Sequence, residues 1–325
     1  MPDALADNRI ALDEPSLDFR HLSSEELQEH LDILTETMQE LRRAGLTVWV
    51  HPEMWTEVHC LDGIDLATFL FTPEASSVNR DTLRLLARLL DRCPSWQEDE
   101  PGYVSSVTIT SADDQGGDGR EMVLDLGFSL GVLLHQDRRM ACLTFGPSRR
   151  GIWTLSDKGV SRQAYFFGAF PELCRFWRWL YTAEDIQEDD FFTLAGHAFP
   201  ALEFHPALKF GAFVGSYFQL RDTVVRILGV LNDHFAEVMG QHSGLPHQVQ
   251  AALGAHGVNL SPESPRIRGS DKLMAQRTVT FNGDSYVCEW HAKLAPDRNR
   301  IHFSLPDQRL DGKILIGIFT EHLDT

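Results

Sequence analysis

The clearest pattern in the sequence is an apolar stripe near the amino end, spaced as on one face of a helix. Its members recur every three or four residues: Leu27, Leu31, Leu34, Met38 and Leu41. Ser23 and Glu26 have the spacing of a capping box at its start, and Gly45 supplies a stop just after two arginines. The pattern predicts a helix, followed by a strand over the β-branched and aromatic residues 46–50.

The pattern then changes from helix to short strands. Residues 80–92 predict a second helix that ends before Pro94. The Gly- and Asp-rich residues 111–120 predict a hairpin loop. Strands are expected on both sides of this loop and beyond it, over 103–110, 121–130, 131–146 and 151–155.

Residues 163–240 are mainly helical in pattern. They begin with an aromatic-rich segment over 164–181 and end with a long helix from about 214 to 239, which Gly240 stops. A short helix over 246–254 follows. The loop 259–270, rich in proline and serine, is the preferred domain boundary.

The last seventy residues carry the strongest strand pattern. Segments 277–281 and 286–294 flank Asn282-Gly283, a favoured two-residue hairpin turn. A second hairpin joins 286–294 to 300–305, and 313–319, apolar on both faces, is typical of a central strand. These segments predict an antiparallel β-meander of about four strands.

The expected fold class is therefore α+β, in three parts. Residues 1–157 would form an α+β domain with a mixed antiparallel sheet and helices. Residues 158–257 would be a mainly helical middle, and 258–325 a small β-rich domain.

Alternation along the second hairpin separates an apolar face from a basic one. In the register set by the loop APDRN, Lys293 faces Arg300 and His291 faces His302. Like charges directly opposite each other destabilise a ladder, and no carboxylate is obvious beside Arg300. The face therefore suggests an anionic ligand, such as a phosphodiester backbone. His322, just beyond the next strand, would lie at the same end of the sheet.

The same face also has a purely structural interpretation. A polar strand face is often only solvated, and a five-residue loop fixes the register to within a residue or two. Four further histidines lie close together in sequence but fit no metal-binding spacing: His234, His242, His247 and His256. Nucleotide-binding, zinc-protease and hydrolase motifs do not occur, so neither a cofactor nor a metal is expected.

The net charge is informative about function only when it is calculated separately for different segments of the chain. The 325 residues hold 29 Lys or Arg against 47 Asp or Glu, a net charge of −18, which argues against a surface that attracts nucleic acid everywhere. Residues 251–325, however, hold nine of each sign. The whole deficit belongs to the first 250 residues, so the basic hairpin face lies in a neutral segment, and the acidic region could bind a protein partner.

The cysteines and the hydropathy pattern bear on location. Five widely spaced cysteines without a CxxC pair indicate neither a disulfide framework nor a cysteine zinc site. The amino end is acidic and has no secretory pattern, and no apolar run is long enough to span a membrane. We expect a cytoplasmic protein with no membrane contact.

The runs CEWHAKLAPDRNRIHF and GKILIGIFTEHLDT resemble a C-terminal β-rich module of bacterial defence and toxin-associated proteins. Their layout is similar to the small RelE/ParE-type toxin fold, over roughly 60 residues. The resemblance implies RNA cleavage without a metal, in which clustered basic and histidine side chains position the phosphate and transfer protons. The matching candidates are His291, Lys293, Arg300, His302 and His322.

Two functions are therefore expected as alternatives. In the first, the protein belongs to a bacterial defence or toxin-type system, and its C-terminal domain binds, and in one form cleaves, RNA or another phosphodiester. In the second, it is a non-enzymatic scaffold or sensor subunit of a larger assembly, and the C-terminal module binds a protein partner.

Overall fold

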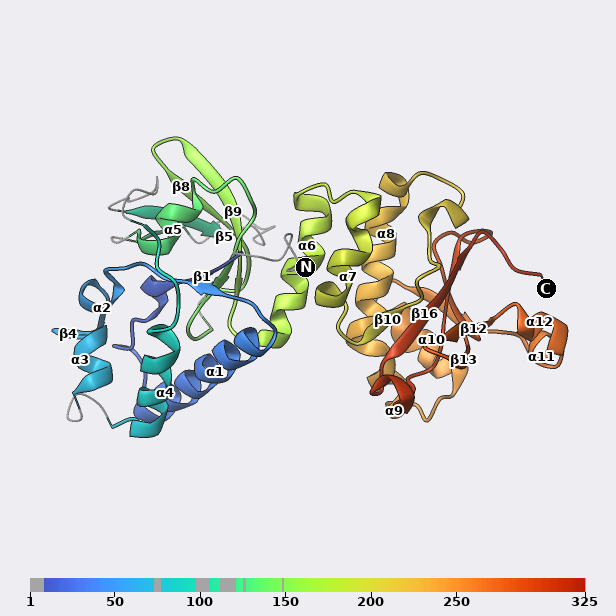
Figure 1. Cartoon of the computed structure of the whole chain (residues 1–325), viewed down its shortest axis with the longest axis horizontal. Helices are drawn as coiled ribbons and strands as arrows, with labels where there is room; N and C mark the ends of the chain where they lie inside the picture. Colours follow the sequence, from blue (N-terminus) through green and yellow to red (C-terminus); the bar gives the residue numbers. More distant parts are fainter. Residues whose placement is uncertain are drawn as a thin grey trace. The chain divides into compact units, whose positions relative to one another are not determined.

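The computed structural model describes residues 9–72, 77–97, 106–111, 121–124, 127–147 and 149–324. The chain divides into two compact units, residues 1–176 and 177–325 (Figure 1). Helices and strands are mixed in both units, which confirms the α+β class expected from the sequence.

The first unit is organised around a mixed seven-stranded sheet. Its strand order is β2-β1-β7-β9-β8-β5-β6. The strands from β2 to β9 run parallel, and those from β9 to β6 run antiparallel. The bounds are β1 Ile10–Leu12, β2 Val48–Trp49, β5 Val107–Ser111, β6 Glu121–Leu124, β7 Ala141–Leu143, β8 Gly151–Asp157 and β9 Val160–Phe167.

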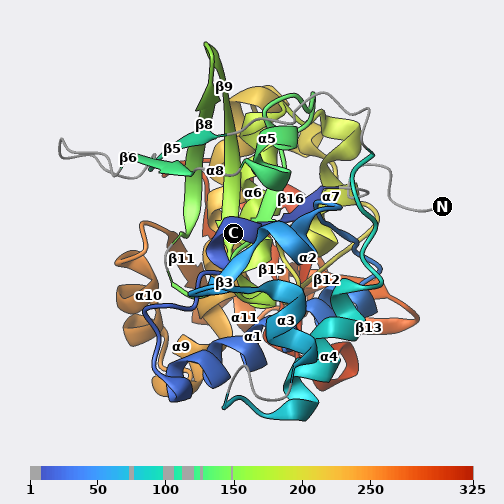
Figure 2. The same cartoon turned by 90° about the vertical axis from the view of Figure 1, so that its left-hand side faces the viewer.

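Five α-helices and a small hairpin complete the described part of the first unit. The helices are α1 Ser24–Arg43, α2 Met54–Glu57, α3 Leu66–Phe71, α4 Arg80–Leu90 and α5 Phe128–Leu133, and the hairpin joins β3 His59–Leu61 to β4 Ile64–Asp65. The capping box at α1 is confirmed, because Ser23 and Glu26 each bond the other's backbone N–H. α1 and α4 pack side by side (Figures 1 and 2).

Two strand predictions in this unit are wrong in part. The expected strand over 121–130 ends at Leu124, and the expected strand over 131–146 is reduced to Ala141–Leu143. Between them, the apolar run of α5 folds as a fully buried helix. A short apolar run has no periodicity that separates a buried strand from a buried helix. The loop predicted over 111–120 lies almost entirely outside the described residues.

The second unit combines a five-stranded sheet of order β10-β16-β15-β14-β11 with a separate hairpin, β12–β13. Only the β10–β16 pair is parallel. The strands are β10 Leu202–Phe204, β11 Asn259–Pro262, β12 Thr278–Phe281, β13 Asp284–Val287, β14 Trp290–Lys293, β15 Arg300–Phe303 and β16 Ile314–Thr320. The central position expected for the last strand is confirmed.

Helices precede this sheet in sequence and connect its strands. They are α6 Leu173–Ala183, which contains the boundary between the units, α7 Phe191–Ala198, α8 Tyr217–Val230, α9 Ala236–Gln241, α10 Pro246–Gly254, α11 Pro265–Arg268 and α12 Asp271–Ala275. A π-helical turn, Leu231–Phe235, joins α8 to α9, so the long helix expected near 214–239 is interrupted but present.

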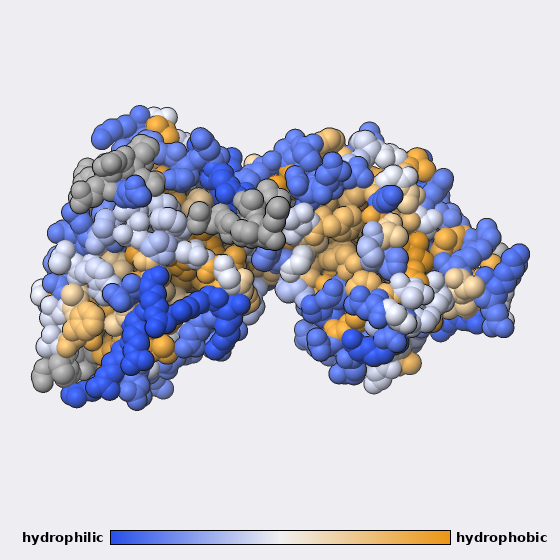
Figure 3. Space-filling view, in the orientation of Figure 1, coloured by the Kyte–Doolittle hydropathy of each residue, from blue (hydrophilic) through white to orange (hydrophobic). Residues whose placement is uncertain are grey.

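Aromatic side chains form much of the core between these helices and the sheet. Their rings contact one another in a continuous group: Phe191, Phe192, Phe204, Phe210, Phe213, Tyr217 and Phe319. Figure 3 shows that some apolar residues reach the surface between α8 and β16. The aromatic content of the middle segment therefore packs against the last strand of the chain.

The unit boundary differs from the boundaries expected near 157 and 257. β9 extends the first unit, because its residues 165–167 pair with β7 and its residues 160–166 pair with β8. β10 pairs with β16, which places the helical middle with the C-terminal sheet. The loop 259–270, expected as a boundary, contains β11 and α11.

The expected continuous strand over 286–294 is broken at Cys288 and Glu289. β13 before the break pairs with β12, whereas β14 after it belongs to the five-stranded sheet. Cys288 is fully buried, and its Sγ fills the space above Gly317 in β16. A Cβ atom at Gly317 would overlap that sulfur and would lie 3.3 Å from Cγ2 of Val279.

This close approach predicts that Gly317→Ala lowers the free energy of unfolding by about 1–3 kcal/mol, the usual cost of overpacking a core. Adding Cys288→Ala removes the overlapping sulfur and should recover part of the loss. Gly196→Ala is the control, because a Cβ there meets no atom within 4 Å. Urea unfolding followed by circular dichroism measures all four proteins. Equal effects at positions 317 and 196 would contradict the packing described.

Candidate functional site

The five residues selected from the sequence line a single cavity in the second unit. The register of β14 and β15 is the one expected, because His291 pairs with His302 and Lys293 with Arg300. His322, which follows β16, lines the same cavity. Its volume is about 330 Å³. The structure therefore brings all five side chains together, while their functional roles stay a prediction.

The five residues differ in how deeply they lie. His302 and His291 are buried, with 1% and 8% of their surface exposed. Lys293 and Arg300 are half-buried, and His322 is exposed. The histidine pair thus forms the floor of the cavity, and the other three lie nearer to solvent.

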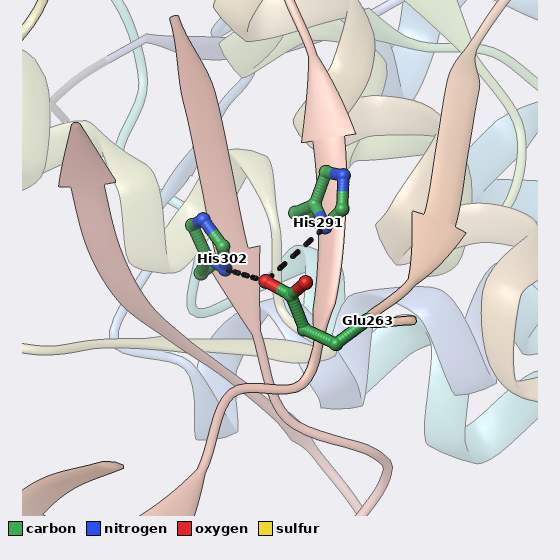
Figure 4. A group of neighbouring side chains, drawn as sticks. All are labelled: Glu263, His291 and His302. Carbon is green, nitrogen blue, oxygen red and sulfur yellow. Dashed lines mark ion pairs between the residues drawn. The ribbon is translucent and has the colours of Figure 1, made fainter. Parts of the chain in front are cut away.

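A carboxylate that the sequence analysis missed also reaches the floor. Glu263 follows edge strand β11 directly, and its backbone N–H donates to the carbonyl of Glu289 just before β14. One oxygen, Oε1, lies 3.8 Å from Nδ1 of His291 and 3.8 Å from Nδ1 of His302 (Figure 4). Glu263 is only 4% exposed.

Arg277, the second residue that was missed, fixes this carboxylate in place. Its Nε donates to Glu263 Oε1 at 2.7 Å, and its two other nitrogens donate to the backbone carbonyls of Leu273 and Asp324. The ion pair is buried, with side chains 2% and 5% exposed. All three guanidinium nitrogens are therefore used within the protein.

The sequence held weak signals for both residues. Glu263 stands in SPESP, where two prolines and two serines favour a loop over a strand. Arg277 precedes the first hairpin strand and resembles any solvated basic residue. Neither position shares a periodic pattern with the histidines, so only the fold brings them together.

Burial keeps both floor histidines neutral. Burial, together with the smaller effect of the positive charges of Arg300 and Lys293, lowers the pKa of His291 to about 4. Burial likewise lowers the pKa of His302 to about 3, with smaller contributions from His291 and Arg277. Near pH 7 each imidazole therefore has a ring nitrogen with a free lone pair, which can accept a proton or bind a metal ion.

Four buried polar atoms around the cavity have no hydrogen-bond partner. They are Nδ1 of His291, both ring nitrogens of His302, and Nη1 of Arg300. Buried polar atoms are nearly always paired in folded proteins, and exceptions point to a ligand, an ion or water. Within the described residues, Arg300 and Lys293 also form no ion pair. The cavity is thus equipped to receive a ligand.

Comparison with known protein families, curated proteins and solved structures finds no significant match to this chain. The resemblance to RelE/ParE-type toxins accordingly stays a prediction. Among the helices of the described residues, none is long and apolar enough to cross a membrane.

The depressed pKa values predict that stability falls in acid. Above about pH 6.5 both histidines are neutral whether the chain is folded or unfolded, so their contribution is fully present. As the pH falls toward 4, the unfolded chain binds protons that the folded chain does not. In the presence of a chelator, the free energy of unfolding should drop by about 1.4 kcal/mol per pH unit for each histidine.

Urea unfolding at a series of pH values checks this dependence. His302→Gln should make the slope between pH 6.5 and 4 shallower, because it removes one of the two groups. His256→Gln, at an exposed position, serves as the control and should leave the slope unchanged. Identical slopes in the two variants would show that the buried pair does not control acid stability.

Proposed function

We propose that the second unit binds the phosphodiester backbone of RNA over this cavity and acts as the effector part of a bacterial defence or toxin-type system. The observation that carries the proposal is the pairing of Lys293 with Arg300 across the ladder, at the mouth of the cavity, with no acidic partner in the described chain. Like charges in this arrangement cost stability. A bound anion would offset that cost.

The chemistry of the two cations favours phosphate. A guanidinium presents a planar fork of donors that matches two phosphate oxygens, and the Lys293 ammonium adds a mobile positive charge. Nη1 of Arg300 is buried and unpartnered, so this donor is available to a ligand within the cavity. A phosphate group held there would lie close to the neutral histidines on the floor.

The basic character continues beyond the cavity, which favours a polymer over a small phosphate compound. α11 lines one side through Ile267 and carries the exposed Arg266 and Arg268. An extended strand of RNA could contact these arginines while one phosphate occupies the mouth. Single-stranded nucleic acid is commonly bound by such positively charged grooves.

Cleavage of the bound RNA is the second part of the proposal. In the metal-free protein, His291 and His302 are the candidates for accepting the 2′-hydroxyl proton, because a neutral imidazole is the form that accepts a proton. Their low pKa values make them weak bases near neutral pH, so this step would be slow. The exposed His322 lines the same cavity and is a candidate for protonating the leaving oxygen. These roles correspond to the ones implied by the toxin resemblance.

RNA binding by the full-length protein tests the proposal. With a fluorescent single-stranded RNA in the presence of a chelator, Lys293→Ala combined with Arg300→Ala should weaken binding at least about tenfold, since each charged hydrogen bond contributes about 1.5 kcal/mol or more. The slope of log affinity against log salt should become shallower by about 1.4, for two lost phosphate contacts.

The matched control removes two positive charges elsewhere. Arg175 and Lys209 are exposed and do not line the cavity, so Arg175→Ala with Lys209→Ala should bind RNA as the wild type does. Equal losses in both double variants, or no RNA binding by the wild type, would overturn the proposal. Capture of a protein that depends on Lys293 and Arg300, without RNA binding, would favour the scaffold function instead.

A further inference from the structure

We infer that Glu263, His291 and His302 form a binding site for one divalent transition-metal ion at the floor of the cavity. The three residues offer one carboxylate oxygen and two imidazole nitrogens, and these atoms lie within 4.8 Å of one another. All three residues are buried. Nothing in the sequence pattern indicated this site, because its carboxylate belongs to the segment that follows a separate strand, β11.

The distances from Glu263 to the two histidines suit an ion placed between the side chains. A Zn²⁺ ion binds imidazole nitrogen and carboxylate oxygen at about 2.0–2.2 Å, so two ligand atoms of one ion are at most about 4.2 Å apart. Both Nδ1 atoms meet this limit in their 3.8 Å distance from Glu263 Oε1. Figure 4 shows the two rings on neighbouring strands, both turned toward the same carboxylate.

Hydrogen bonding within the protein does not account for this arrangement. A separation of 3.8 Å is too long for a hydrogen bond between an imidazole and a carboxylate. Neither Nδ1 finds another partner, although His302 is 99% and His291 92% buried. Two buried, unpartnered nitrogens directed at one carboxylate oxygen are the arrangement that a shared ion would satisfy.

The surrounding contacts are those that usually support metal ligands. A ligating histidine commonly uses its other nitrogen to bond a neighbouring group, and a ligating carboxylate is itself hydrogen-bonded. Here Nε2 of His291 contacts Oγ of Ser261 at 3.3 Å, and Arg277 holds Glu263 at 2.7 Å. These contacts orient His291 and Glu263 before any ion binds, whereas Nε2 of His302 has no hydrogen-bond partner.

The donor set selects the class of ion. Two imidazoles and one carboxylate suit Zn²⁺, Fe²⁺, Co²⁺ or Mn²⁺ better than Ca²⁺ or Mg²⁺, which prefer oxygen ligands. Three protein ligands leave at least one coordination position open, as in catalytic zinc sites. The open position would be available to water or to an oxygen atom of a bound ligand.

Charge links this site to the proposed function. Arg277, Lys293 and Arg300 lower the affinity of the cavity for a bare cation, whereas a phosphate at the mouth would offset their charge. To this extent the inference rests on the proposed function: a phosphate group and the ion should each strengthen the binding of the other. Ion binding itself does not require the phosphate, because the three ligands are all on the floor of the cavity.

Titration of the chelator-treated, full-length protein with Co²⁺ and Zn²⁺, in the absence of RNA, tests the site. We expect one high-affinity equivalent, with a Co²⁺ absorption spectrum typical of nitrogen and oxygen ligands. Glu263→Gln and His302→Gln should each weaken binding at least about 100-fold, because removing even a supporting partner of a ligand costs about 10–100-fold. Circular dichroism monitors whether these variants fold.

Two further variants keep the test decisive if a buried substitution prevents folding. Ser261→Ala changes a half-buried position next to His291 and should weaken ion binding about tenfold or more. His256→Ala is the control, because its ring stacks on that of His234 in a separate pair of histidines that could bind metal superficially. Loss of the binding equivalent in His256→Ala, with retention in Ser261→Ala and Glu263→Gln, would overturn the inference.

The proposals for the ion site and for the RNA site can be rejected independently of each other. Lys293→Ala with Arg300→Ala should still bind one equivalent of Zn²⁺, whereas RNA binding in a chelator should survive Glu263→Gln. Metal binding without RNA binding would retain the ion site and reject the proposed function. RNA binding by a wild-type protein that takes up no stoichiometric Zn²⁺ or Co²⁺ would reject the ion site alone.

Discussion

Arg277 donates to Glu263 through Nε and to the backbone carbonyls of Leu273 and Asp324 through its other nitrogens. Its own carbonyl accepts from the backbone N–H of Cys288. Through its guanidinium and its backbone carbonyl, Arg277 thus connects the end of β11, helix α12, the break before β14 and the end of the described chain. A buried ion pair is tolerated only when its remaining hydrogen-bonding groups are satisfied, and here the guanidinium has a partner at each nitrogen. The position of the Glu263 carboxylate, and with it the geometry of the cavity floor, depends on this pair.

The cavity consequently has two chemically different levels. Its floor combines a fixed carboxylate with two imidazoles that burial keeps neutral. Its mouth has two half-buried cations directly opposite each other. The net charge of −18 describes neither level, because charges separated by more than about a Debye length are largely screened from one another. A ligand entering the cavity therefore responds to the local arrangement of charge rather than to the sum over the chain.

The residue pairs of the site that could be predicted from the sequence are those set by strand alternation and by the length of one loop. Alternation with a period of two, together with one short loop, was enough to place His291 opposite His302 and Lys293 opposite Arg300. Glu263 could not be found in this way, because its proximity depends on β11 pairing with β14 across about thirty residues of chain. The same limit explains why part of β9 was expected in a helical region and α5 was expected as strand. Their apolar runs fit helix and strand equally well, and only pairing with a neighbouring strand or packing in the core selects one.

Neither a cation nor an anion alone would satisfy both the floor Nδ1 atoms and the two cations at the mouth. An anion at the mouth pairs with Lys293 and Arg300 but leaves both floor Nδ1 atoms without a partner. A metal ion at the floor engages those nitrogens but adds positive charge beside three existing cations, which only one carboxylate opposes. When both are bound, the nitrogens are coordinated and the anion balances the charge, and an oxygen of the anion can fill the open coordination position of the ion. The proposed ion and the proposed phosphate would therefore form a composite site, in which each removes the cost that the other would incur alone.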